Sequence, residues 1–477
     1  MAETQSSPTP DDAPPGLTEP TPPKKKTRGR LFRCFKYLAL LMLTSMVLLG
    51  CAYGVWHYSA KSQLAAAKQK MIDRGEPFWF ADLAPEPVDP DMDGTPYFQR
   101  ACKLIVEPND TFLSLLDEDD NAEARDGPTR PMDLPEFRKA LKENQPALDM
   151  LRQAIQQSRI RSKVNYETTA PLSLQPDELR HARTLANLLK AENLQSLATN
   201  QSQQAVNAVQ DRLALAELFR EEPLLLLQLL RVALGIRASR SIGVTVANID
   251  LAPDQFASLD KTLANVQETF SLRLGIRGER CAVATMMENI GSDDWYLIGE
   301  DNYMSEYYGF LAPQAMQEQA FMLDLHTRLE ATIDKPGPKG QFLHRAIEED
   351  VNNAPRFYMI TRMVFPAALL VRNIGLRYRQ ALINARLGIR VDRYRDEHGK
   401  LPERLEDVLD DKLKEIPPGL FSDQPLVYRV LDDGFTIYPV GENGVDDGGE
   451  RKPDRLEGGS AFRVRYPAAK AGEAALP

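Results

Sequence analysis

The stretch YPVGENGVDDGGERKP, residues 438–453, holds the densest group of residues in this chain that could do chemistry. Four glycines are interleaved with acidic and amide side chains directly after an apolar run. Such a composition is typical of a metal-binding loop, of a tight turn or of a solvated tail. The surrounding sequence is needed to distinguish these three alternatives. Its oxygen-bearing side chains are Glu442, Asn443, Asp446, Asp447 and Glu450.

Histidines and catalytic motifs give little support for an enzyme. Beyond residue 58 the histidines are His181, His326, His344 and His398. None lies in an H-E-x-x-H motif, and the chain has no G-x-S-x-G, Walker or G-x-G-x-x-G motif. His344 and Glu348 are four residues apart, so on a helix they would share a face and could hold a proton or a metal. A solvated surface pair is the commoner result of this spacing, and the sequence favours a protein without catalytic activity.

The most aromatic part of the chain is SDDWYLIGEDNYMSEYYGF, residues 292–310. Aromatic rings beside acids can line a groove for a peptide or a sugar. The same residues can also pack a corner between a helix and a loop, and we favour packing. Asp293, Asp294 and Glu300 are the carboxylates that a hydrolase in this region would use.

Composition excludes some function classes. The net charge is −10, and the only dense basic cluster lies beside an apolar segment, which argues against a nucleic-acid-binding protein. The four cysteines form no C-x-x-C motif, which argues against a zinc site. Cys102 and Cys281 can form a disulfide in an oxidising compartment or remain two buried thiols.

Residues 36–58 are predicted to be a transmembrane helix. The run 37–56, YLALLMLTSMVLLGCAYGVW, contains no charged residue, and twenty residues at about 1.5 Å each span roughly 30 Å of bilayer. Residues 1–35 are predicted to be a disordered cytoplasmic tail, because they are polar and rich in proline and carry the basic cluster. The remainder of the chain then lies outside the cytoplasm. The basic residues are Lys24, Lys25, Lys26, Arg28, Arg30, Arg33 and Lys36.

Two other interpretations of the apolar run stay open. The sequence LLGC, ending at Cys51, is similar to a lipoprotein box, in which the cysteine is lipidated after cleavage. A cleaved secretory signal is the other alternative. Leu49 stands where a lipoprotein box usually has a small residue, and the apolar run continues past Cys51, so an uncleaved single-pass anchor is favoured.

Residues 59–375 are predicted to be a helical extracytoplasmic domain, and the fold class is mainly α. Leucines and alanines recur at intervals of three and four from Leu179 to Leu194, as on the buried face of a helix. Further helices are expected at about 254–273, 313–332, 340–351 and 366–396, and prolines lie in the gaps between them. Antiparallel helix pairs of this kind are similar to a helical-repeat array, although no fixed period is present.

Residues 376–477 are predicted to be a small α/β module. A long amphipathic helix should end at Gly399, followed by a short second helix. PLVYRVL (425–431) and FTIYPVG (435–441) alternate as strands of a hairpin around an Asp-Asp-Gly turn. SAFRVRYP (460–467) is a plausible third strand.

This module resembles the C-terminal domain of the major pseudopilins of type II secretion systems. The matching residues are YRDEHGKLPERLEDV, SDQPLVYRV and GFTIYPVGENGVDDGG. The whole chain is similar to membrane-anchored proteins of planctomycete-like bacteria that carry such a module after a long helical region. The resemblance covers 70 to 90 residues. It implies a bacterial inner-membrane protein with most of the chain in the periplasm.

In pseudopilins the loop after the second strand typically binds calcium, which needs six to eight oxygen ligands. The resemblance therefore implies calcium as a cofactor, with Glu442, Asn443, Asp446 and Asp447 as its ligands. Pro439 and Asn443 depart from the family pattern, which favours Ser and Asp there, and an acidic surface turn is the alternative. The apolar segment also lacks the leader and the glutamate of a pseudopilin, so we do not expect this chain to polymerise.

The sequence thus predicts a non-enzymatic, membrane-anchored cell-envelope protein that serves as a protein-interaction or structural module with a link to secretion. Its partners would be the membrane, through residues 36–58, and another envelope protein, and no nucleic acid. The alternative is an envelope hydrolase that acts on peptidoglycan or polysaccharide through acidic residues.

Overall fold

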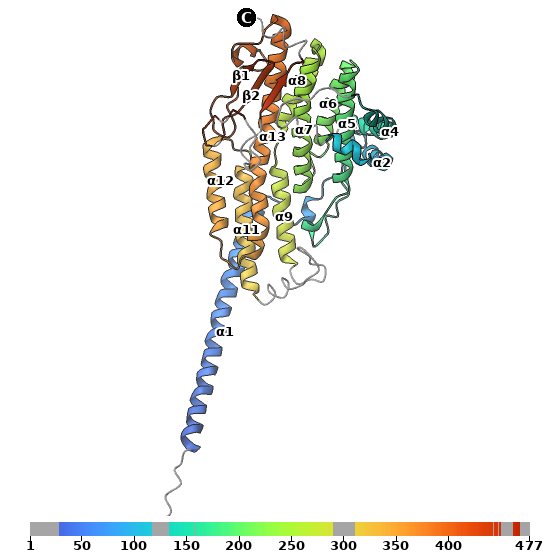
Figure 1. The fold of residues 1–477 in the computed structure, drawn as a ribbon. Helices are drawn as coiled ribbons and strands as arrows, with labels where there is room; N and C mark the ends of the chain where they lie inside the picture. The colour runs from blue at the N-terminus through green and yellow to red at the C-terminus, as the bar shows by residue number, and fades with distance from the viewer. Residues whose placement is uncertain are drawn as a thin grey trace, which may run out of the picture. The chain divides into compact units, whose positions relative to one another are not determined.

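The computed structural model describes residues 28–116, 133–157, 159–289, 311–441, 443–446, 448–449 and 461–467 (Figure 1). The chain divides into two compact units, Met1–Ser59 and Ala60–Pro477. The described residues are mainly helical and end in a small antiparallel sheet, which confirms the predicted mainly α fold class.

Helix α1 (Arg28–Asp73) begins in the first unit and ends in the second, and it exposes its large apolar side chains from Phe35 to Val55. None of its most apolar window is buried, and the helix is long enough to cross a membrane. Exposing this much apolar surface to water is costly, whereas a bilayer would cover it. α1 is therefore a candidate membrane span, as the sequence predicts for residues 36–58.

The second unit contains the remaining helices. Among the described residues they are α2 (Thr95–Leu104), α4 (Pro135–Gln157), α5 (Glu178–Ala198), α6 (Ser202–Glu217), α7 (Leu225–Asn248), α8 (Pro253–Thr269), α9 (Arg273–Glu288), α11 (Ala312–Thr332), α12 (Gly337–Asn352) and α13 (Met359–His398). Short 3-10 turns are η1 (Ala81–Leu83), η2 (Pro90–Met92), η3 (Pro171–Ser173) and η4 (Leu405–Val408).

Two large apolar cores hold these helices together. One joins α2, α4, α5 and α6 to α7, and the other joins α7, α8, α9, α11, α12 and α13 to the sheet. α7 belongs to both cores because it is buried on nearly every side. A third, smaller core packs the last turns of α1 against α9 and α11 through Leu64, Met71 and Leu323.

α13 is longer than expected. The prediction began at Pro366, but the helix begins seven residues earlier and carries that proline on an exposed side. α13 is apolar enough to pass as a membrane span, yet half of its most apolar window is buried in the core. It ends at Gly399, which has φ of 69° and caps the helix as predicted.

The C-terminal sheet has three strands, β1 (Val427–Leu431), β2 (Gly434–Tyr438) and β3 (Phe462–Arg465), in the order β1-β2-β3. Both pairs are antiparallel, and Leu431 faces Gly434 across the turn, so the predicted hairpin is confirmed. β2 is central and buried along its whole length, whereas β1 is an edge strand.

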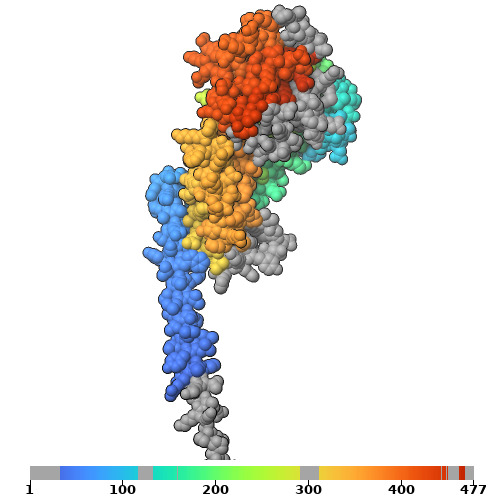
Figure 2. Space-filling model, turned by 60° about the vertical axis from the view of Figure 1, so that its left-hand side comes forward, coloured from blue at the N-terminus to red at the C-terminus, as the bar shows by residue number. Residues whose placement is uncertain are grey.

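The sheet lies directly on the helices. A Cβ atom at Gly388 of α13 would come within 2.0 Å of the Phe462 ring of β3, so the glycine allows strand and helix to touch. β3 also packs against α7. Figure 2 shows the sheet region, in red-orange, at one end of the yellow and orange helices α11 to α13. The predicted module boundary at residue 376 falls in the middle of α13, which serves both the body and the sheet.

Candidate functional site

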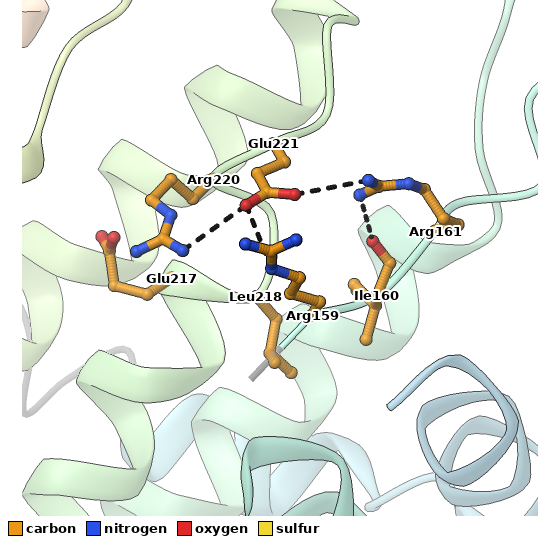
Figure 3. Close-up of a pocket in the computed structure, with 7 residues that line it drawn as sticks. All are labelled: Arg159, Ile160, Arg161, Glu217, Leu218, Arg220 and Glu221. Atoms are coloured by element: carbon orange, nitrogen blue, oxygen red, sulfur yellow. Dashed lines mark hydrogen bonds and ion pairs between the residues drawn. The ribbon is translucent and has the colours of Figure 1, made fainter. Parts of the chain in front are cut away.

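Three arginines converge on one glutamate on the surface of the second unit (Figure 3). We call Arg159, Arg161, Arg220 and Glu221 the arginine cluster. In Figure 3 the carboxylate of Glu221 lies with Arg220 to its left, Arg161 to its right and Arg159 below it. The nitrogen–oxygen distances from Glu221 are 3.4 Å to Arg159, 3.3 Å to Arg161 and 3.5 Å to Arg220. All four side chains are partly exposed, at 22–38%.

The N-terminus of α2 fixes the segment that carries the first two arginines. The amide of Gly94 donates to the carbonyl of Arg159 at 2.7 Å, and the amide of Arg161 donates to the hydroxyl of Thr95 at 2.8 Å. Ile160 between them is buried in the core. The backbone that carries the two arginine side chains is therefore held in place by these hydrogen bonds and by the burial of Ile160.

The turn between α6 and α7 carries Arg220 and Glu221. Gln228, buried on α7, donates hydrogen bonds to the carbonyls of Phe219, Arg220 and Glu222. One side chain thus satisfies three buried or partly buried carbonyls and sets the shape of the turn. The Phe219 ring packs edge-on against the core.

The cluster contains more positive than negative charge. Glu217 also lines the site, but its carboxylate pairs with the buried guanidinium of Arg231 at 2.7 and 3.0 Å. Glu221 is then the one carboxylate, among the described lining residues, that is left for three guanidinium groups. The site is a shallow surface depression that encloses no space for a water-sized molecule, so a ligand there would lie on the surface.

A buried carboxyl lies directly behind the cluster. Glu222 is fully buried, and one of its oxygens accepts a hydrogen bond from the amide of Ser162 at 3.0 Å. Burial raises the pKa of Glu222 to about 7, although the Ser162 amide and the Arg161 charge oppose the shift. Burial also raises the pKa of the nearby Tyr166 hydroxyl, and the Glu222 charge adds to that effect.

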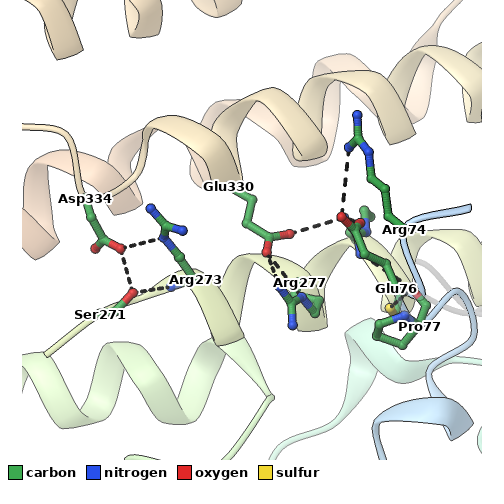
Figure 4. A network of polar contacts seen from close by, with 10 residues as sticks. Arg74, Glu76, Pro77, Ser271, Arg273, Arg277, Glu330 and Asp334 are labelled. Atoms are coloured by element: carbon green, nitrogen blue, oxygen red, sulfur yellow. Dashed lines mark hydrogen bonds and ion pairs between the residues drawn. The ribbon is translucent and has the colours of Figure 1, made fainter. Parts of the chain in front are cut away.

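A second polar network fastens the chain after α1 to the body (Figure 4). Arg280 on α9 is 1% exposed and pairs with Glu76 at 2.7 Å and with Glu330 on α11 at 3.1 Å. Arg277 also binds Glu330, at 2.6 Å. Figure 4 shows Asp334, which follows the end of α11, beside Arg273. The buried members form ion pairs with one another, so we assign this network a structural role.

A second hollow lies in the C-terminal module. It is a cleft of about 610 Å³ that lies beside the start of the edge strand β1. Acidic side chains outnumber basic ones in its lining. The charged residues are Glu403, Glu406, Glu415, Asp423, Arg404 and Lys414, and the apolar ones are Leu405, Leu409, Ile416, Pro418, Pro425 and Leu426, with Tyr428 completing the lining.

Two of the four predicted calcium ligands lie outside the described residues, namely Glu442 and Asp447. Asp446 accepts hydrogen bonds from the amide of Gly448 and the hydroxyl of Tyr438, each at 2.9 Å, and forms an ion pair with Arg429. These donors lower the pKa of Asp446, the Gly448 amide most of all.

The carboxylate of Asp446 would therefore have to release Arg429 before it could bind a cation. The other described candidate, Asn443, accepts a hydrogen bond from the amide of Val445 at 3.0 Å. Within the described residues no group of three or more histidine, cysteine, aspartate or glutamate side chains is placed to hold a metal. Calcium binding at this loop stays a prediction.

The other candidates from the sequence are also placed. His344 is buried while Glu348 is exposed, so the pair does not form the shared surface site that their spacing allowed. Cys102 and Cys281 are free thiols, so the disulfide alternative is wrong for this structure. Asp293, Asp294 and Glu300 lie outside the described residues.

The sequence analysis did not single out the arginine cluster. The available signal was two charged runs far apart in the chain, RIRSK at residues 159–163 and REEP at residues 220–223. No family model, no curated protein and no solved structure matches the chain.

Proposed function

We propose that this chain is a membrane-anchored bacterial envelope protein without catalytic activity, which binds an extended segment of a partner protein in the cleft beside β1. The cleft is the observation that carries the proposal. Its volume of about 610 Å³ lies in the range of ligand sites, and its lining combines apolar and charged side chains.

The edge position of β1 supports the proposal that the partner segment binds in an extended conformation. β1 pairs with β2 on one side and with no other strand among the described residues on its other side. An exposed sheet edge offers backbone donors and acceptors to a further strand, and neighbouring pockets then select side chains. We infer that the partner segment adds to β1 and places side chains in the cleft.

The charge of the lining indicates the chemistry of that segment. The cleft carries four acidic and two basic side chains, so it favours a partner with lysine or arginine side chains among apolar ones. The helical body would then be a repeat-like spacer. The apolar part of α1 would anchor it in the inner membrane, with the N-terminus in the cytoplasm and the second unit in the periplasm.

Binding of synthetic peptides to the full-length chain in dodecyl maltoside tests the proposal. We expect a six-residue peptide that alternates lysine and valine to bind, and its glutamate–valine counterpart not to bind. A lysine–valine peptide with N-methylated backbone should lose at least tenfold in affinity, because strand addition needs its N–H groups.

Charge reversal in the cleft, Glu403→Lys with Glu406→Lys, should also weaken binding of the lysine–valine peptide at least tenfold. The matched control is Glu348→Lys with Glu349→Lys, which makes the same charge change at exposed positions of α12 outside the cleft. An equal loss of peptide affinity in both double variants would show that only the net charge matters. It would refute the cleft as the binding site. A glycan-cleaving activity that is abolished by Asp293→Ala or Glu300→Ala would overturn the non-enzymatic proposal in favour of a hydrolase.

A further inference from the structure

The contacts within the arginine cluster are longer than those of the tightest arginine–carboxylate pairs of this protein, although other pairs, such as Arg379 and Asp334 at 3.7 Å, are longer still. Charge-assisted N–H···O bonds normally measure about 2.7–2.9 Å. Arg152 reaches Glu192 at 2.6 Å and Arg231 reaches Glu217 at 2.7 Å. The three contacts of Glu221 measure 3.3–3.5 Å. Two carboxylate oxygens therefore do not bring three guanidinium groups to ideal distance at once.

Donor groups of the cluster remain available for a ligand. Arg159 contacts Glu221 through Nε and Arg220 contacts it through one terminal nitrogen, each at a long distance. Each guanidinium has five N–H donors in a planar fork that matches phosphate oxygens. The side chains are 38% and 35% exposed, so these donors can be reached from solvent.

Charge also favours an anion at this position. Three guanidinium groups face the single carboxylate of Glu221, because Glu217 is held by Arg231. The carboxyl of Glu222 behind the cluster repels an anion less than an exposed one would, since burial leaves it only partly ionised near neutral pH.

We propose that the arginine cluster is a binding site for a phosphate group, which its three guanidinium groups clamp, while Glu221 acts as an internal anion that competes with the ligand. A tetrahedral oxyanion offers three or four oxygens, so it can satisfy all three arginines where a carboxylate cannot. The phosphate group would come from a soluble phosphate monoester or from a lipid headgroup. The site is distinct from the cleft beside β1 and shares no residue with it.

Isothermal titration of the full-length chain in dodecyl maltoside with inorganic phosphate tests this site. Arg161→Gln and Arg220→Gln should each lower the affinity for phosphate at least tenfold. Glu221→Gln should raise it at least fivefold, because the competing carboxylate is removed. Opposite effects of neighbouring substitutions cannot both come from loss of folding. The matched control is Arg138→Gln, which removes an exposed arginine paired with Asp133 at 2.7 Å and should leave phosphate binding unchanged.

Three results would overturn the proposal. The first is no phosphate binding by either the unmodified chain or Glu221→Gln. The second is equal weakening by Arg138→Gln, which would indicate adventitious binding to surface charge only. The third is acetate binding as tight as phosphate binding in Glu221→Gln, which would indicate a carboxylate site.

A further titration identifies the source of the phosphate group. In nanodiscs with phosphatidylglycerol, a lipid-headgroup site is expected to be occupied already and to show lower apparent affinity for added phosphate than in dodecyl maltoside, which contains no phosphate. A site for soluble phosphate monoesters is expected to show the same affinity in both.

Discussion

Glu222→Gln is expected to make the protein more stable at pH 8 and to change its stability little at pH 5. Glu222 is fully buried, and burial raises its pKa from 4.5 to about 7. A carboxyl with a raised pKa binds its proton more tightly in the folded than in the unfolded state. Its contribution is therefore fully present below pH 4.5 and is lost as the pH rises through 7.

The size of the effect follows from the shift. At about 1.4 kcal/mol per pKa unit, the shift corresponds to roughly 3 kcal/mol, of which about 2.5 kcal/mol falls between pH 5 and pH 8. Glutamine has the same shape and its amide oxygen can still accept from the Ser162 amide, but it never becomes charged. The difference in unfolding free energy between the two proteins should thus grow by about 2.5 kcal/mol over this range.

Urea denaturation of the full-length chain in dodecyl maltoside at pH 5, 6, 7 and 8 measures this difference. Burial lowers the pKa values of His326 and His344 to about 4, so both contribute stability above pH 6.5 that is lost toward pH 4. These histidines are present in both proteins, so their contribution cancels in the comparison. Glu348→Gln at an exposed position is the control and should show no pH-dependent difference. Parallel pH profiles for Glu222→Gln and the unmodified chain would refute the reasoning.

Three further predictions concern packing, ion pairs and metal binding. Arg280→Ala should lower the unfolding free energy by about 3–5 kcal/mol, because it removes one partner of a buried ion pair. Arg273→Ala, at an exposed ion pair, should lower it by less than about 1 kcal/mol. Equal losses of the two variants in urea denaturation would contradict this prediction. Gly235→Ala should destabilise the protein by about 1–3 kcal/mol, because the added Cβ would come within 2.2 Å of the Tyr378 ring. A rise in the melting temperature of this variant would contradict the prediction, because it would show that the ring moves aside without cost. If the loop binds calcium, the melting temperature should be higher in calcium than in chelator, and Arg429→Gln should enlarge this difference because it removes the ion-pair partner of Asp446. The same melting temperature in calcium and in chelator, for the variant and for the unmodified chain, would rule out the calcium loop.

Much of the fold could be predicted from local sequence. The uncharged run 37–56 indicates a helix whose surface suits a bilayer, and apolar residues at intervals of three and four indicate the helices of the body. The hairpin follows from period-two alternation around Asp432-Asp433-Gly434, and Gly399 ends α13 with the positive φ that glycine adopts without strain. These features depend on residues that are near one another in the chain.

The arginine cluster depends on contacts between distant segments. It joins residues 159–161 to residues 220–221. His344 was expected at the surface and is buried, because α12 packs it toward Arg372 on α13. Sequence periodicity says which face of a helix is apolar, but it does not say which other helix covers that face.

The sequence by itself determined the helices, the hairpin and the candidate membrane span, because each arises from hydrogen bonding and side-chain periodicity within a short segment. The tertiary structure alone decided that Glu221 stands among three arginines and that Glu222 beside it is buried. Two adjacent glutamates of the same chemistry differ in role because one side chain is partly exposed among the arginines and the other is buried in the packed core, where burial raises its pKa.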